Sequence, residues 1–118
     1  GIAAEDIGKC AYGIFKQGER FIGKTVGIAG EHLTGAQMAE ALARSLRQPV
    51  SYNAVPPEVY RSFGFPGADD LGNMFQYKRD FESDFCGARD LAQARALNPE
   101  LQTFAKWLEG NQTRIPTT

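Results

Sequence analysis

The chain has 118 residues, of which 42% are hydrophobic and 23% charged, the composition of an ordinary soluble globular domain. Its net charge is −1 and its basic residues are scattered, which argues against binding to nucleic acid or to an anionic membrane. Cys10 and Cys86 stand far apart and form no metal motif, so we expect reduced thiols in an intracellular protein. No apolar run is long enough to span a membrane.

The first predicted elements are a helix and a strand. Apolar residues recur at helical spacing from Ile7 to Phe15, and Gly18 is a plausible helix stop. Segment 24–29 (Lys-Thr-Val-Gly-Ile-Ala) is short and apolar, which predicts a strand. The glycine inside it indicates a close approach or a sheet edge.

The next elements are a capped helix and a second strand. Thr34 followed by Gln37 has the spacing of a capping box, in which side chain and backbone bond reciprocally at a helix start. The apolar stripe that follows ends before Pro49, and alternation over 50–55 predicts another short strand.

The rest of the chain is predicted to be helical around a shaped turn. Pro57 suits the first position of a short helix that runs to Phe63. A Gly-Phe-Pro-Gly turn follows, and Asp69-Asp70 are expected to cap the helix after it. Later apolar residues at helical spacing predict helices over about 71–85, 91–97 and 103–109.

These elements indicate an α/β class, as a mostly helical fragment with about two short strands and five helices. Two strands do not make a stable sheet alone. Either they pair with each other under the helices, or segment 24–29 lies at the edge of a sheet that another segment supplies. In the second case we expect self-association or strand exchange when the chain is alone.

Two short motifs suggest nucleotide chemistry and are better explained as local structure. Residues 18–25 match the phosphate-loop pattern G-x-x-x-x-G-K-[ST], but a helix precedes them and a strand is predicted to follow, the reverse of the required order. Tyr12 and Lys16 have the spacing of a dehydrogenase pair, without a nucleotide loop upstream. His32, the only histidine, has no nucleophile at a suggestive position, so the chain offers no catalytic constellation and no metal site.

The turn and the helix after it carry a family resemblance. Gly64-Phe65-Pro66-Gly67-Ala68, leading into Asp70-Leu71-Gly72-Asn73-Met74-Phe75, resembles the C-terminal part of the NmrA-like family, atypical relatives of the short-chain dehydrogenases. The similarity is strongest to the redox-sensor branch of animals. It extends over nearly the whole chain, through segments 6–8, 21–28, 33–34, 50–52, 97–99 and 104–108.

The resemblance implies that residues 1–118 form the C-terminal cap subdomain of a longer protein whose N-terminal Rossmann domain, absent here, binds NADP(H). This chain alone is then expected to bind no cofactor. The implied function is regulatory, in the cytoplasm with the nucleus as a second location, with docking of protein partners or a second copy and no contact with nucleic acid or membrane. One alternative is the substrate-binding part of an NAD(P)H-dependent reductase of quinones or phenols. Another is a free-standing helical interaction domain.

Five side chains are the candidate lining of the cleft that such a cap would cover. They are large and apolar or aromatic, and each also suits an ordinary core position. The candidates are Phe65, Met74, Phe75, Tyr77 and Trp107.

Overall fold

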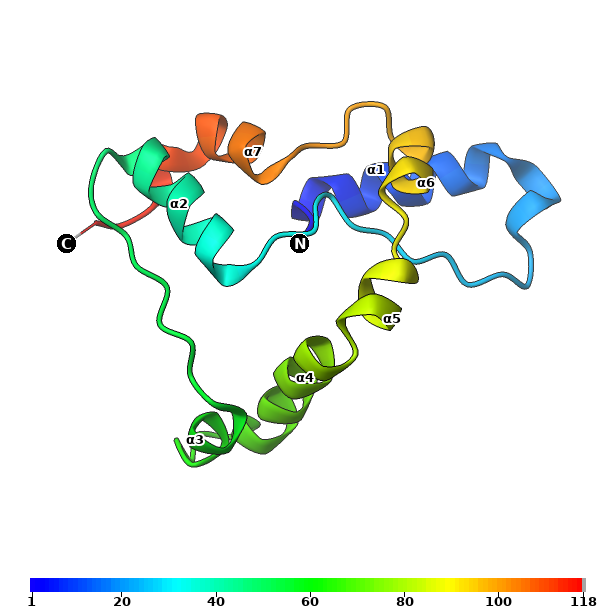
Figure 1. Cartoon of the computed structure of the whole chain (residues 1–118). Helices are drawn as coiled ribbons and strands as arrows, with labels where there is room; N and C mark the ends of the chain where they lie inside the picture. Colours follow the sequence, from blue (N-terminus) through cyan, green and yellow to red (C-terminus); the bar gives the residue numbers. More distant parts are fainter. Residues whose placement is uncertain (118) are drawn as a thin grey trace. The chain divides into compact units, whose positions relative to one another are not determined.

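The computed structural model describes residues 1–117 and folds them into helices joined by irregular segments (Figure 1). Its contacts divide the chain into two compact units. Unit 1 comprises Gly1–Tyr52 together with the chain from Arg89 onward, and unit 2 comprises Asn53–Ala88. Across residues 1–117 there are seven α-helices and two 3-10 helices, more than the five helices predicted.

Unit 1 is built from two pairs of packed helices. In the first pair α1 lies against α6, and in the second α2 lies against α7. The elements of this unit are α1 (Ala4–Lys16), the 3-10 helix η1 (Gly18–Phe21), α2 (Gly35–Leu46), α6 (Leu91–Leu97), α7 (Phe104–Asn111) and the 3-10 helix η2 (Gln112–Arg114).

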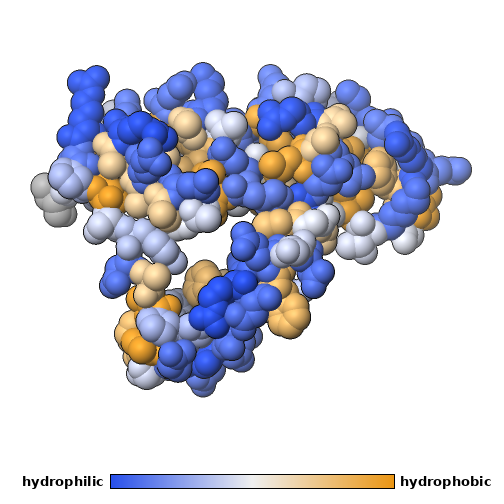
Figure 2. Space-filling model, viewed as in Figure 1, coloured by the Kyte–Doolittle hydropathy of each residue, from blue (hydrophilic) through white to orange (hydrophobic). Residues whose placement is uncertain are grey.

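The core of unit 1 is small. Its buried cluster is Cys10, Ala94 and Leu101, against which Ile2 and Ile28 pack. Hydrophobic residues are correspondingly visible on the surface in Figure 2. Burial of so little apolar area supplies little hydrophobic stabilisation, so polar contacts and close helix packing carry more of the stability of this unit.

The predicted apolar stripe of the first helix is only partly correct. Cys10 is fully buried, but Ile7 and Phe15 are 47% and 79% exposed. The face of α1 that packs consists instead of Asp6, Cys10 and Gly13. The stripe expected from the spacing is therefore offset from the face that contacts α6.

Gly13 allows α1 and α6 to approach closely. A Cβ atom at this position would lie 2.1 Å from the carbonyl oxygen of Leu97 and 2.8 Å from its carbonyl carbon. Any side chain larger than hydrogen would force the two helices apart. The same helix contains Gly8, where an added Cβ would meet nothing within 4 Å.

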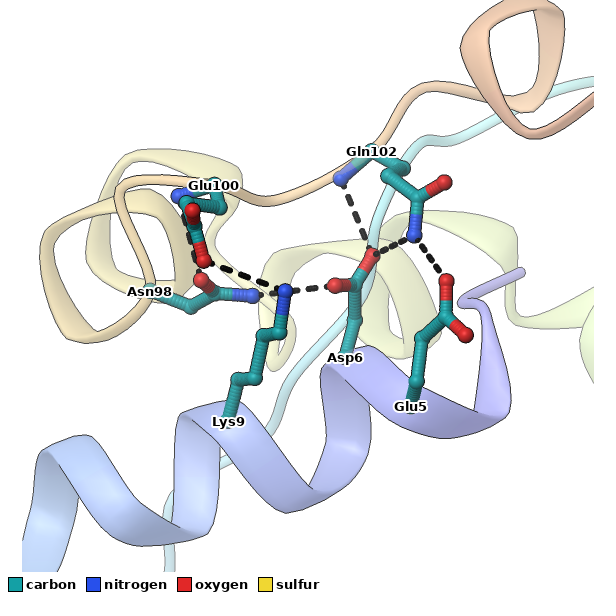
Figure 3. Close-up of polar contacts among 6 residues, drawn as sticks. All are labelled: Glu5, Asp6, Lys9, Asn98, Glu100 and Gln102. Atoms are coloured by element: carbon teal, nitrogen blue, oxygen red, sulfur yellow. Dashed lines mark hydrogen bonds and ion pairs between the residues drawn. The ribbon is translucent and has the colours of Figure 1, made fainter. Parts of the chain in front are cut away.

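A buried carboxylate fastens the chain after α6 to the start of α1 (Figure 3). Asp6 is fully buried, and its two oxygens accept hydrogen bonds from the Asn98 side chain at 3.1 Å and the Gln102 backbone N–H at 2.9 Å. The Gln102 side chain also donates to Glu5 at 2.6 Å. Lys9 pairs with Glu100 at 3.1 Å on the exposed side. Residues 98–102 are thereby held in one conformation.

The capping box predicted for the second helix is confirmed. The Thr34 hydroxyl accepts from the Gln37 backbone N–H at 3.2 Å, and the Gln37 side chain accepts from the Thr34 N–H at 2.9 Å. The helix ends at Leu46, where Arg47 adopts a left-handed conformation with φ of 55°. Thr103 caps α7 in the same manner, by accepting from the Lys106 N–H.

The two predicted strands are wrong, because residues 1–117 contain no strand. No backbone hydrogen bond joins residues 25–29 or 50–55 to any other described segment, so neither has a partner with which to form a ladder. Segment 50–55 also lies between prolines at 49 and 56, which lack the N–H that a ladder needs. The α/β class is corrected accordingly, and the mostly helical character is confirmed.

Unit 2 consists of three helices: α3 (Pro57–Arg61), α4 (Ala68–Asp80) and α5 (Glu82–Gly87). Pro57 occupies the first helical position, as predicted. The helix predicted to continue to Phe85 is interrupted at Phe81, whose backbone angles of −120° and 39° are not helical. The cap of α4 is Gly67, while Asp69-Asp70 lie in its first turn, where negative charge complements the helix dipole.

Candidate functional site

The turn between α3 and α4 gathers four aromatic rings, which we name the aromatic corner: Tyr60, Phe63, Phe65 and Phe75. Gly64 and Gly67 flank the turn with φ of +69° and +90°. These left-handed conformations are cheap only for glycine. The Gly-Phe-Pro-Gly sequence thus reverses the chain so that rings from both helices meet.

Tyr60 is the centre of the aromatic corner. Its ring lies 5.6 Å from the Phe63 ring, 5.7 Å from Phe65 and 5.3 Å from Phe75, measured between centroids. The contacts with Phe65 and Phe75 are edge-to-face, the arrangement that the ring quadrupoles favour. Each such pair contributes about 0.5–1.5 kcal/mol beyond burial. The corner is therefore an ordered surface with a defined shape.

Close packing of α3 on α4 supports the corner from behind. Gly72 is buried, and a Cβ there would lie 2.5 Å from the Cγ atom of Arg61. The Arg61 guanidinium donates to the Gln76 side chain at 2.8 Å and to the Asn73 side chain at 3.3 Å. These bonds fix the register of the two helices and so the positions of the rings.

The aromatic corner is largely uncovered. Phe63, Phe65 and Phe75 are 54%, 38% and 47% exposed. The buried residues of unit 2 are Pro57, Ala68 and Gly72, all of them small. Large apolar side chains that form no core are typical of a surface that another domain or protein covers.

Charge around the corner is mixed, with an excess of acid. Unit 2 contains six acidic and three basic residues, a net charge of −3. The Lys78 ammonium lies 5.7 Å from the centre of the Phe75 ring and 5.2 Å from that of Phe85. A hydrogen bond from the neighbouring Arg79 guanidinium lowers the pKa of the Asp80 carboxyl below its ordinary value. Because the Lys78 ammonium lies over the exposed Phe75 ring, one edge of the aromatic corner is polar.

Four of the five residues predicted to line a cleft belong to unit 2. Phe65 and Phe75 are members of the corner, and Met74 is an exposed neighbour on α4. Tyr77 is half exposed and stacks on Phe81 at 5.1 Å. Trp107 belongs to unit 1.

Sequence reasoning missed Tyr60, although the rings gather around it. Tyr60 and Phe63 stand three residues apart in the segment predicted to be helical from Pro57 to Phe63, and helical spacing of this kind places two aromatic side chains on one face. That signal was present in the sequence. In the structure α3 ends at Arg61, and Phe63 lies in the turn after it, still next to Tyr60. The corner therefore has two walls, one from α3 and one from α4.

The motifs set aside on sequence grounds have structural roles. Residues 18–21 form η1, and residues 22–34 contain no helix whose N-terminus could face a phosphate. The Lys16 ammonium lies 5.4 Å over the Tyr12 ring. The Nε2 atom of His32 donates to the Arg89 carbonyl oxygen at 2.8 Å, since a carbonyl only accepts.

Two further observations concern residues 1–117 as a whole. Within them no three acidic, histidine or cysteine side chains converge as metal ligands would. Nor does any helix in that range combine the length and the apolar character needed to cross a membrane.

A comparison with known protein families shows to which family the chain belongs. The sequence matches the NmrA-like family over residues 2–108, which is most of the chain. The chain therefore belongs to the NmrA-like family, whose members are NAD(P)-binding regulatory or reductase-like proteins. The family predicted from the turn and the following helix is confirmed, while its redox-sensor branch stays a prediction.

Proposed function

We propose that this NmrA-like chain is the C-terminal portion of an NADP(H)-sensing regulatory protein of the cytoplasm and nucleus. In this proposal unit 2 caps the cleft beside the nicotinamide and contributes a surface to protein partners. The cofactor itself is held by a Rossmann domain that precedes the chain in the longer protein. The uncovered aromatic corner is the observation that carries the proposal.

The aromatic corner supports a capping role because it is ordered and yet exposed. Tyr60 holds two rings edge-to-face, while unit 2 buries only small residues. If Phe63, Phe65 and Phe75 were covered by a cofactor domain, several hundred Å² of apolar surface would leave water. At about 25 cal/mol per Å² that burial contributes several kcal/mol. It would also exclude water from the cleft.

Unit 1 supports the same proposal through segment 25–29. None of its backbone N–H or C=O groups bonds to the backbone of another described segment, although 26–29 are partly or fully buried. Such groups normally find partners in a native protein, because leaving them unpaired is costly. Hydrogen bonds to the domain that we propose precedes this chain would satisfy them.

Titration with NADPH tests the proposal in two proteins. The 118-residue chain is expected to bind no NADPH, and the longer protein that contains it is expected to bind it. In the longer protein, Phe75→Ala should weaken NADPH binding or its effect on partner binding, since it opens the cap. Phe15→Ala, a matched removal of an exposed ring outside unit 2, should not. Micromolar binding of NADPH to the isolated chain would contradict the proposal.

A second candidate is the substrate-binding part of an NAD(P)H-dependent reductase of quinones or phenols. The specific observation in its favour is the edge-to-face cluster around Tyr60, whose exposed rings match a flat aromatic substrate. Oxidation of NADPH by the longer protein with a simple quinone distinguishes the two. Turnover that Phe75→Ala reduces would favour the reductase, and NADPH binding without turnover would favour the regulator.

Self-association of the isolated chain is a further expectation of the capping role. Exposed rings in unit 2 and the unpaired segment 25–29 in unit 1 both present surfaces that a second copy could cover. Light scattering should therefore report a mass that rises with concentration. A compact monomer that melts cooperatively at high concentration would instead favour a free-standing interaction domain.

A further inference from the structure

Unit 1 contains a pocket that the capping role does not use. Its volume is about 510 Å³, within the range of about 300–1,000 Å³ that small-molecule sites occupy. Three segments far apart in sequence form it: the start of α1, the approach to α2, and α7 with the residues before it. The side chains that matter most are Glu31, Leu33, Met38, Phe104 and Trp107.

One side of the pocket is flat and apolar. The rings of Phe104 and Trp107 are nearly parallel, at 12°, with their centroids 6.3 Å apart. Leu33 and Met38 also line the pocket, and Met38 is 42% exposed although apolar. Parallel rings and a flexible thioether favour a planar apolar guest, which stacks on the rings and is packed by the methionine.

The polar side chains around the pocket are mainly hydrogen-bond acceptors. One oxygen of Glu31 accepts from the Phe104 N–H at 2.8 Å, and its second oxygen has no partner among residues 1–117. Glu5 and Gln102 line the same pocket. The side-chain N–H groups of Gln102 donate to Glu5 and Asp6, so its side-chain carbonyl oxygen is the atom that can accept a hydrogen bond from a ligand. Two cations line the pocket as well, and both already donate within unit 1: the N-terminal ammonium of Gly1 to the Glu31 carbonyl oxygen at 2.9 Å, and the Arg114 guanidinium to the Asn111 side chain at 3.0 Å.

These acceptors are held in place before any ligand arrives. Backbone hydrogen bonds join Glu31 to Gly1 in both directions, at 2.9 and 3.2 Å. Gln102 is bonded through both its backbone and its side chain to the carboxylate of buried Asp6. Groups fixed in this way lose little conformational entropy on binding. The pocket therefore combines a side of fixed hydrogen-bond acceptors, two of them carboxylates, with a flat apolar side.

From these features we infer that the pocket binds a small planar aromatic molecule that carries a protonated amine. The aromatic body stacks on Phe104 and Trp107, and the ammonium donates to the free oxygen of Glu31, with Glu5 adding negative charge. The inference rests on unit 1 alone and does not depend on the proposed role of the aromatic corner.

A pair of probes of opposite charge tests the inference on the 118-residue chain. 4-Phenylbenzylamine and 4-phenylbenzoate share a biphenyl body and differ in the charged group. Trp107 is the only tryptophan of the sequence, so its selectively excited fluorescence reports on the pocket. The amine should give a saturable change with a Kd of about 0.1–1 mM, as expected for a ligand of this size. The carboxylate should bind at least about tenfold more weakly.

Single substitutions test whether the Glu31 carboxylate is responsible for the affinity of the pocket for the amine. Glu31→Gln keeps an oxygen that can accept from the Phe104 N–H, so the fold should persist while affinity for the amine falls about tenfold. Glu40→Gln removes an exposed carboxylate that pairs with Arg44 on α2, and it should leave the affinity unchanged. If Glu31→Gln loses its helical circular dichroism, Glu5→Gln serves instead, with a smaller loss of affinity expected.

Three results would overturn the inference. One is the absence of saturable binding by the amine. Another is equal affinity for the amine and the carboxylate, which would reduce the pocket to a non-specific apolar surface. The third is an equal loss of affinity in Glu31→Gln and Glu40→Gln, which would indicate a general effect of net charge. None of these results bears on NADPH binding by the longer protein.

Discussion

Two glycines of the same helix should respond oppositely to substitution by alanine. At Gly13 an added Cβ would lie 2.1 Å from the Leu97 carbonyl oxygen, more than 1 Å inside the usual contact distance. The obstacle is backbone, so α1 and α6 must separate around the buried cluster of Cys10 and Ala94. Overpacking of this kind costs about 1–3 kcal/mol, and alanine recovers up to about 1 kcal/mol of helix propensity. The difference predicts that Gly13→Ala lowers the free energy of unfolding by about 1–2 kcal/mol.

Gly8 provides the matched control. It lies on the exposed side of α1, and an added Cβ would meet nothing within 4 Å. Only the helix propensity should change there, so Gly8→Ala should raise the free energy of unfolding by about 0.5–1 kcal/mol. Urea unfolding followed by circular dichroism measures both changes. Equal effects of the two substitutions, in either direction, would refute the close approach of α1 and α6.

Four further predictions concern buried groups and exposed rings. Asp6→Asn should lower the free energy of unfolding in urea by about 2–3 kcal/mol, because one acceptor oxygen becomes a donor that faces an N–H group. A loss below about 0.5 kcal/mol would contradict the hydrogen bonds of Asp6 to Asn98 and Gln102. Cys10 should react with a maleimide far more slowly than half-buried Cys86, and the reverse order would be contradictory. Burial, with a lesser effect of Asp6, raises the pKa of the Cys10 thiol above its ordinary value of 9.0. The Cys10 thiol therefore contributes its full stabilisation below pH 9.0, and this stabilisation is lost as pH rises through the higher pKa of the thiol in the folded protein. In Cys10→Ala this additional loss of stability at high pH should be absent. Phe75→Ser should lower the apparent mass by light scattering, since it removes an exposed ring, and an unchanged mass would exclude the corner from self-association.

Local signals in the sequence predicted the helices well. The capping box of Thr34 and Gln37 and the first-turn position of Pro57 depend on contacts between near neighbours, which the sequence states directly. The turn at Gly64 and Gly67 was recognised as shaped for the same reason, since both glycines have positive φ. The aromatic residues after it were correctly placed on a helix.

Signals that depend on distant partners were less reliable. The composition of segment 24–29 favours a strand, but a strand needs a neighbour, and none is present in residues 1–117. The burial of Asp6 has no local signal in the sequence, because its hydrogen-bond partners stand more than ninety residues away. Trp107 was grouped with the aromatic residues of unit 2, whereas its ring partner is Phe104. Spacing within one segment carries no information on such contacts.

Hydrogen exchange at the backbone amides of segment 25–29 is the sharpest test of whether another domain completes this chain. We propose that a preceding domain of a longer NmrA-like protein covers this segment and bonds to its backbone groups. In a dilute sample of the isolated chain these amides should exchange rapidly, because no backbone partner protects them. In the longer protein they should exchange orders of magnitude more slowly, with the amides of α2 as an internal reference. Slow exchange in the monomeric chain, or equally fast exchange in both proteins, would contradict the covering of segment 25–29 by a preceding domain.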